Sequence, residues 1–237
     1  MAGIDTAALT QAFSDWAPNQ FAILEPGEDT RHRIPDAWWP TAASPDPDER
    51  KVAAMALWNN DFLAMIPGFA QALCERLVDV RVVQHSWLPA PTLDYVLIDD
   101  EGRHAVWLGE DPATFGDTEP TFFEALPPQA DTFLRSVHAG FTTWDGESCG
   151  LIAPARMQTY AAYVGWPEPL SAPPAALEPD SIHPLRMLRI GGRESYSDLL
   201  VSPDHPQGFA ITYFEPDFDV TLFGHALDEL MMMALEG

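Results

Sequence analysis

The chain has 237 residues, 46% of them hydrophobic, so it is long enough to fold around a sizeable core. It carries 36 acidic against 12 basic side chains, a formal net charge of −24. This balance argues against nucleic acid or an anionic membrane as partner, because both require a positively charged surface. A basic protein partner is compatible with it, since opposite charges attract at long range. Solubility alone is an alternative explanation of the charge, and it stays open.

Cysteine use and hydropathy give no sign of a secreted or membrane protein. Cys74 and Cys149 are too few for a disulfide scaffold, and their spacing fits no zinc motif. The sequence shows neither a basic-then-apolar leader nor an apolar run long enough to span a bilayer. We therefore expect a cytoplasmic protein without a metal or another cofactor.

Apolar side chains recur at helical spacing in several stretches, and each predicts a helix. The stretches are residues 5–16, 48–77, 132–138, 154–165 and 222–235. Pro67 is predicted to divide the second stretch into two helices, and Gly140 to end the third by adopting a positive φ. In the last helix we expect these side chains to face the core: Leu222, Leu227, Leu230, Met231 and Leu235. Residues 18–47 are predicted to form an ordered loop anchored by tryptophans.

Short runs of β-branched and aromatic residues, bounded by turn signals, predict the strands. The runs are residues 80–83, 95–98, 105–108, 141–144, 150–152, 185–190, 197–201 and 209–214. The second and third runs are predicted to form a hairpin through residues 99–103, and the Pro-rich residues 167–179 are predicted to form a surface loop. Hairpins with flanking helices are typical of the α+β class, with a mixed, largely antiparallel sheet. We expect a single domain over residues 1–237, in which residues 1–125 are an extended N-terminal part.

A motif runs through the middle of the chain, from Leu126 to Pro154. It reads Leu-Pro, then a helix ending in Phe-Leu-x-x-x-His-x-Gly-Phe, then Gly-Leu-x-x-Pro. Its positions are Leu126, Pro127, Phe133, Leu134, His138, Gly140, Phe141, Gly150, Leu151 and Pro154. This order resembles the signature of the SMI1/KNR4 (SUKH) family. Ala139 inside the turn and the long region before Leu126 depart from the family pattern.

The resemblance implies a mixed sheet packed against helices and a non-catalytic, protein-binding role. Most often such a module is an immunity protein that binds and blocks a cognate toxin in the cytoplasm. The toxin would come from a contact-dependent or type VI secretion system. The family has no catalytic residue to carry over, and the matched positions are fold-forming. A regulatory scaffold that associates weakly with several host proteins is an alternative.

An enzymatic alternative rests on residues 146–150, a literal Gly-x-Ser-x-Gly with Ser148 at its centre. In an α/β-hydrolase this pattern is a nucleophile elbow, in which a helix begins at the serine. Residues 150–154 look extended, so a glycine-flanked turn is the favoured interpretation. The acid and base of a serine hydrolase would have to come from a scattered set: Asp204, His205, Asp217 and His225.

The histidines show no spacing typical of a metal site. His138 lies at the end of a predicted helix, and we expect its ring to cap the helix C-terminus, where an imidazolium is favoured. His225 and Asp228 share a helix face, but two such residues seldom suffice for a metal.

Two acidic clusters are the candidate partner-binding residues. They are Asp99, Asp100 and Glu101 at the hairpin tip, and Glu215, Asp217 and Asp219 before the last helix. Both clusters are suited to contact Arg or Lys side chains of a basic partner. The alternative is that they are ordinary polar loops, with Asp217 or Asp219 stabilising the N-terminus of the last helix.

Overall fold

The computed structural model describes residues 6–12, 21–165, 183–193, 197–214 and 217–236. These residues form an α+β fold, which confirms the predicted class. Their strands make two separate five-stranded sheets, and every strand pair recorded in them is antiparallel. No helix among them has the length and apolar character that crossing a bilayer requires.

The first sheet has the strand order β1-β2-β3-β4-β5. Its strands are β1 (Phe21–Ile23), β2 (Leu77–His85), β3 (Thr92–Ile98), β4 (His104–Glu110) and β5 (Phe141–Thr143). The predicted hairpin between β3 and β4 is confirmed, and Asp99 organises its turn. One carboxylate oxygen of Asp99 accepts hydrogen bonds from the backbone N–H groups of Glu101 and Arg103, at 3.0 and 2.7 Å.

The second sheet has the order β10-β9-β8-β7-β6. Its strands are β6 (Gln158–Thr159), β7 (Leu188–Arg193), β8 (Ser197–Val201), β9 (Phe209–Phe214) and β10 (Asp217–Leu222). Three of the five were predicted. The prediction of a continuous helix over residues 154–165 is wrong, because β6 pairs with β7 in the middle of it. β10 is not predicted from the sequence, which indicates a loop up to residue 221 and a helix from Leu222.

Eight α-helices lie in the described part of the chain. They are α1 (Thr6–Ala12), α2 (Trp39–Ala43), α3 (Pro47–Met55), α4 (Asn60–Met65), α5 (Pro67–Arg76), α6 (Pro128–Ser136), α7 (Tyr160–Tyr163) and α8 (Phe223–Met232). Residues 48–77 contain three helices instead of two, because the side chain of Asn59 accepts a hydrogen bond from Phe62 N–H and starts α4. Residues 18–47, predicted as a loop, contain β1 and α2.

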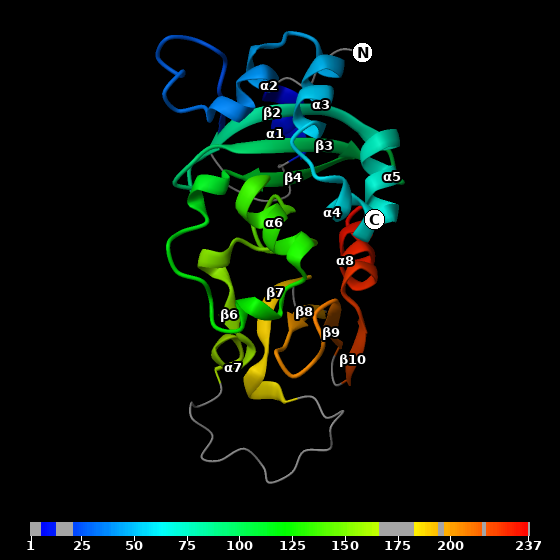
Figure 1. The fold of residues 1–237 in the computed structure, drawn as a ribbon. Helices are drawn as coiled ribbons and strands as arrows, with labels where there is room; N and C mark the ends of the chain where they lie inside the picture. The colour runs from blue at the N-terminus through cyan, green and yellow to red at the C-terminus, as the bar shows by residue number, and fades with distance from the viewer. Residues whose placement is uncertain (1–5, 13–20, 166–182, 194–196, 215–216, 237) are drawn as a thin grey trace.

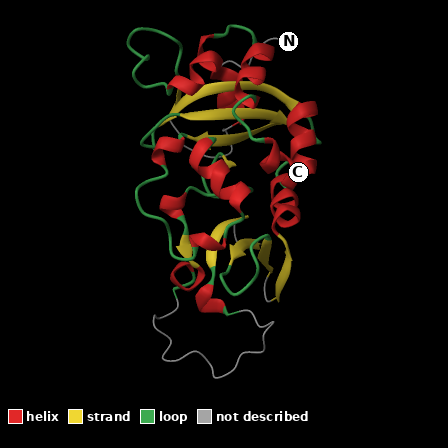
Figure 2. Cartoon of the chain, viewed as in Figure 1, coloured by secondary structure: helices red, strands yellow, loops and turns green. Residues whose placement is uncertain are grey.

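Helices α4, α6 and α8 lie between the two sheets, so the molecule is layered (Figures 1 and 2). One continuous apolar cluster joins the layers. It includes Val82, Leu93 and Trp107 of the first sheet together with Leu188 and Leu199 of the second. This shared core favours the interpretation of the chain as a single domain. That residues 1–125 are an extended N-terminal part of this domain stays a prediction.

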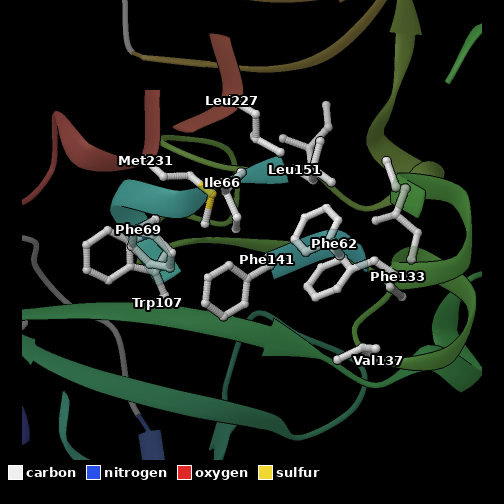
Figure 3. Packing of buried hydrophobic residues seen from close by; sticks show 14 of the residues in the cluster. Phe62, Ile66, Phe69, Trp107, Phe133, Val137, Phe141, Leu151, Leu227 and Met231 are labelled. Carbon is white, nitrogen blue, oxygen red and sulfur yellow. The ribbon is translucent and has the colours of Figure 1, made fainter. Parts of the chain in front are cut away.

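Aromatic side chains fill the centre of that core (Figure 3). The rings of Phe62 from α4 and Phe133 from α6 stack with centroids 4.0 Å apart. Phe69 of α5 packs on Trp107 of β4 at 5.0 Å. Burying each such side chain stabilises the fold by about 1.5–3 kcal/mol. The contact between the N-terminal helices α4 and α5 and the motif region, residues 126–154, is therefore mainly hydrophobic.

The outward face of each sheet carries a smaller apolar cluster. On the first sheet, Val83, Val96 and Val106 pack with Leu9 of α1. On the second sheet the outer cluster contains Tyr160, Met187, Leu200 and Ile211, with Tyr213 and Phe218 packed against it. The second cluster extends to the exposed strand β10, because Phe218 belongs to that strand.

The motif glycines are needed for close packing. Gly140 was expected to have a positive φ, and this is wrong, since it is absent from the positive-φ glycines of the described chain. A Cβ on Gly140 would lie 2.8 Å from Ala153 N. A Cβ on Gly150 would lie 1.9 Å from the carbonyl oxygen of Phe141. Both glycines let β5 lie against the segment around Leu151, whose carbonyl accepts a 2.7 Å hydrogen bond from Phe141 N–H.

Candidate protein-interaction site

His138 lies in the aromatic core and does not cap a helix, so that prediction is wrong. Its side chain is completely buried, and its Nε2 is 2.9 Å from the hydroxyl of Tyr95. The same hydroxyl accepts a 3.0 Å hydrogen bond from Trp58 Nε1–H. Burial lowers the pKa of His138 to about 3. His138 is therefore a buried, neutral structural residue.

The Gly-x-Ser-x-Gly segment forms a turn without the geometry of a nucleophile elbow. A carboxylate oxygen of Asp145 accepts hydrogen bonds from the backbone N–H groups of Glu147 and Ser148. The first helical turn after Ser148 begins only at Pro154. Burial raises the pKa of the neighbouring Cys149 thiol to about 11, which leaves it unreactive at neutral pH. This geometry does not support the serine hydrolase hypothesis.

Three of the side chains considered as catalytic partners or metal ligands, Asp204, His225 and Asp228, have other contacts. Asp204 pairs with Arg186 at 2.9 Å, and His225 Nε2 lies 3.3 Å from a carboxylate oxygen of Glu229. Asp228 binds backbone N–H groups at the start of α5. No group of three or more His, Cys, Asp or Glu side chains in the described residues is arranged to hold a metal ion.

The first acidic cluster is largely paired with arginines of the chain itself. Asp99 is buried, and burial alone would raise its pKa, but hydrogen bonds from Arg103 and the turn amides outweigh this and lower it. Asp100 pairs with Arg76 at 2.6 Å, and Glu101 pairs with Arg103 at 2.9 Å. Asp99 therefore stabilises the β3–β4 turn. A partner-binding role for the cluster stays a prediction.

A polar pocket of about 270 Å³ lies beside β2, α2 and α3. Two arginines line it, but each is already paired. Arg50 donates two 2.7 Å hydrogen bonds to the buried carboxylate of Asp79, and Arg81 pairs with Glu25 at 2.7 Å. The pocket thus presents no unpaired charge that would attract an ionic ligand.

The end of the second sheet has a different character, because apolar side chains are exposed there. Half of the large hydrophobic residues that are exposed in the described chain lie on β9 and β10. Their exposed fractions are Phe209 38%, Phe214 65%, Val220 42% and Leu222 60%. The prediction that Leu222 faces the core is wrong, whereas Leu227, Leu230, Met231 and Leu235 are buried as expected.

β10 is an edge strand. It pairs with β9 over its whole length, and no described strand pairs with its other side (Figure 1). Alternate backbone N–H and C=O groups of an edge strand point away from the sheet. We call β10 with the exposed residues Phe209 and Phe214 the β10 edge.

The two faces of β10 differ in chemistry. Phe218, Val220 and Leu222 lie on one face, opposite Tyr213, Ile211 and Phe209 of β9. Asp217 and Asp219 lie on the other face, both exposed, and the described residues provide no recorded ion pair for either. The structure thus brings these two predicted residues together, while Glu215 lies outside the described residues. The alternative that they stabilise the helix N-terminus is wrong, because α8 begins only at Phe223.

No protein-family model, curated protein or solved structure matches the chain. The likeness to the SMI1/KNR4 family thus rests on the sequence motif alone.

Proposed function

We propose that this chain is a non-catalytic protein-binding module that binds and blocks a cationic protein at the β10 edge. The observation that carries the proposal is the combination of three features at one place. On β10, a strand edge with no partner among the described strands occurs together with exposed apolar side chains and two exposed carboxylates that form no ion pair with the described residues. Exposed apolar patches bordered by polar groups are typical of protein interfaces.

Charge and apolar surface have separate roles in this proposal. The net charge of −24 attracts a cationic partner and raises the association rate, an effect that falls with ionic strength. Once the partner is in contact, Val220 and Leu222 on one face of the sheet and Phe214 on the other supply the buried apolar area that slows dissociation. Asp217 and Asp219 fix the register by pairing with basic side chains.

The partner we propose is a secreted bacterial toxin, and the chain would be its immunity protein in the cytoplasm. The SMI1/KNR4 resemblance supports this identity, and the acidic surface suits a toxin that is itself basic. Blocking would be stoichiometric, by covering the active surface of the toxin. The alternative of a regulatory scaffold differs in its expected behaviour, since it would associate weakly with several proteins.

The test is capture of the natural partner from the source organism with tagged protein, followed by a toxicity assay with the captured protein. We expect one partner in a one-to-one complex, whose toxicity is relieved by the chain. The double variant Asp217→Lys/Asp219→Lys should lose capture. Its matched control is Glu28→Lys/Asp29→Lys, which makes the same charge change at two exposed residues before α2.

Three outcomes would contradict the proposal. They are the absence of a stoichiometric partner, a captured protein that is not toxic, and equal loss of capture in the two double variants. The last outcome would show that net charge alone, and not the β10 edge, determines the association.

A further inference from the structure

β10 is a regular strand whose outer side pairs with no described strand, and its sequence lacks several common barriers to strand addition. Its pairing with β9 runs through six consecutive residue pairs without a register shift. Proteins commonly protect such an edge with Pro, Lys, a bulge or a covering segment. The sequence of β10, Asp-Phe-Asp-Val-Thr-Leu, contains neither Pro nor Lys. Asp217 and Asp219 are its only charged side chains.

We propose that the outer edge of β10 accepts an extended segment of the partner as an added strand, in which basic and apolar side chains alternate. This proposal rests on the proposed protein-binding function and specifies how the partner is recognised. Strand addition supplies affinity through main-chain hydrogen bonds and specificity through alternate side chains.

The alternation follows from the two faces of β10. Side chains directly opposite each other on neighbouring strands share a face and lie about 4.5–5.5 Å apart. Residues of the added strand on one face therefore meet Val220 and Leu222, and are apolar. Residues on the other face meet Asp217 and Asp219, and are Lys or Arg. A partner strand in which apolar and basic residues alternate therefore makes apolar contacts on one face and ion pairs on the other.

A second copy of the chain fits this edge poorly. Two-fold antiparallel pairing of β10 with itself keeps each face on the same side of the joined sheet. The face with Asp217 and Asp219 would then adjoin the same face of the other copy, and like charges placed across strands are destabilising. Each copy also carries a net charge of −24. The charge pattern therefore favours a cationic strand.

Two short capped peptides of identical composition test the proposal with the full chain. In one, lysine and valine alternate, and in the other all lysines precede all valines. We expect the alternating peptide to bind at least about tenfold more tightly by calorimetry, since only it matches both faces. Amide hydrogen exchange of the full chain should show new protection at alternate residues of β10, where outward N–H groups become paired.

Variants give a second readout with matched controls. Val220→Lys puts a cation on the apolar face and should weaken the alternating peptide about tenfold or more. Val52→Lys, at a 72% exposed position of α3, should leave binding unchanged. Asp219→Asn removes one carboxylate with little change in shape and should weaken binding less. Thermal unfolding shows whether each variant is folded.

Equal binding of the two peptides would overturn the proposal, because attraction would then be electrostatic only. Absence of binding by both, or protection outside β10, would overturn it as well. The two proposals fail differently. A neutralised natural toxin that leaves the β10 amides unprotected contradicts strand addition alone, whereas absence of any toxin partner contradicts the proposed function whatever the peptides do.

Discussion

His138 makes the fold sensitive to acid, because it is buried in the neutral form. Its pKa is about 3 in the folded chain, against about 6.5 in an unfolded one. Between these values the unfolded state binds more protons, so stability falls as pH falls from about 6.5 towards 3. The slope from this one group is at most about 1.4 kcal/mol per pH unit.

The measurement is the free energy of unfolding by urea at a series of pH values. We expect His138→Gln to be less stable at neutral pH but to show a shallower loss between pH 6.5 and 4. Val137→Ala removes buried volume from the same core without removing a titratable group, and it should lower stability while keeping the wild-type slope. Parallel slopes for wild type and His138→Gln would show that His138 does not titrate on unfolding.

Gly150 illustrates a residue whose role is set by a distant segment of the fold. Ala at this position would bring its Cβ within 1.9 Å of the Phe141 carbonyl oxygen, so the two segments must separate. We expect Gly150→Ala to lower the free energy of unfolding by about 3 kcal/mol or more. Gly27→Ala, whose Cβ would find its nearest atom at 3.7 Å, is the control and should change little. Similar unfolding midpoints for the two variants would contradict the close-packing explanation.

Among the secondary-structure elements, α5 and α8 are joined by a side-chain cap. The carboxylate of Asp228 on α8 accepts hydrogen bonds from Gly68 N–H and Phe69 N–H, at 2.8 and 2.7 Å. We expect Asp228→Ala to destabilise the fold by about 1–2 kcal/mol, as for loss of an N-cap. Glu229→Ala, next to it and exposed, should cost less than about 0.5 kcal/mol. Equal losses in thermal unfolding would refute the capping role.

Elements defined by local pattern could be predicted from the sequence. The β3–β4 hairpin, the strands β7 to β9 and the body of α6 all follow from hydrophobic period and turn residues. Prediction failed where tertiary contacts decide the structure. Asn59 starts an additional helix, and Gln158–Thr159 becomes a strand only because β7 lies beside it.

The candidate site was predictable only in part. Asp217 and Asp219 stand out by their charge, but the period-two alternation of residues 217–222 is short and is followed directly by a stronger helical pattern. The exposure of Leu222 and Phe214 could not be derived, because it depends on which strand lies at the edge of the sheet. Strand order is a property of the whole fold and not of a local segment.

For the whole molecule, the excess of negative charge predicts that salt stabilises the fold. The described residues contain ion pairs such as Arg50–Asp79, but 12 basic side chains cannot neutralise 36 acidic ones. Screening of the remaining repulsion should therefore outweigh the weakening of exposed ion pairs, each worth at most about 1 kcal/mol. We expect the melting temperature to rise by about 2–5 °C between low salt and physiological ionic strength.

Differential scanning calorimetry at increasing sodium chloride concentration measures this shift. Sucrose at matched osmolality is the control, and it should not reproduce the steep rise of the melting temperature that the first additions of salt cause. A melting temperature that falls with salt would show that the ion pairs, and not the net charge, dominate the electrostatic free energy of the fold.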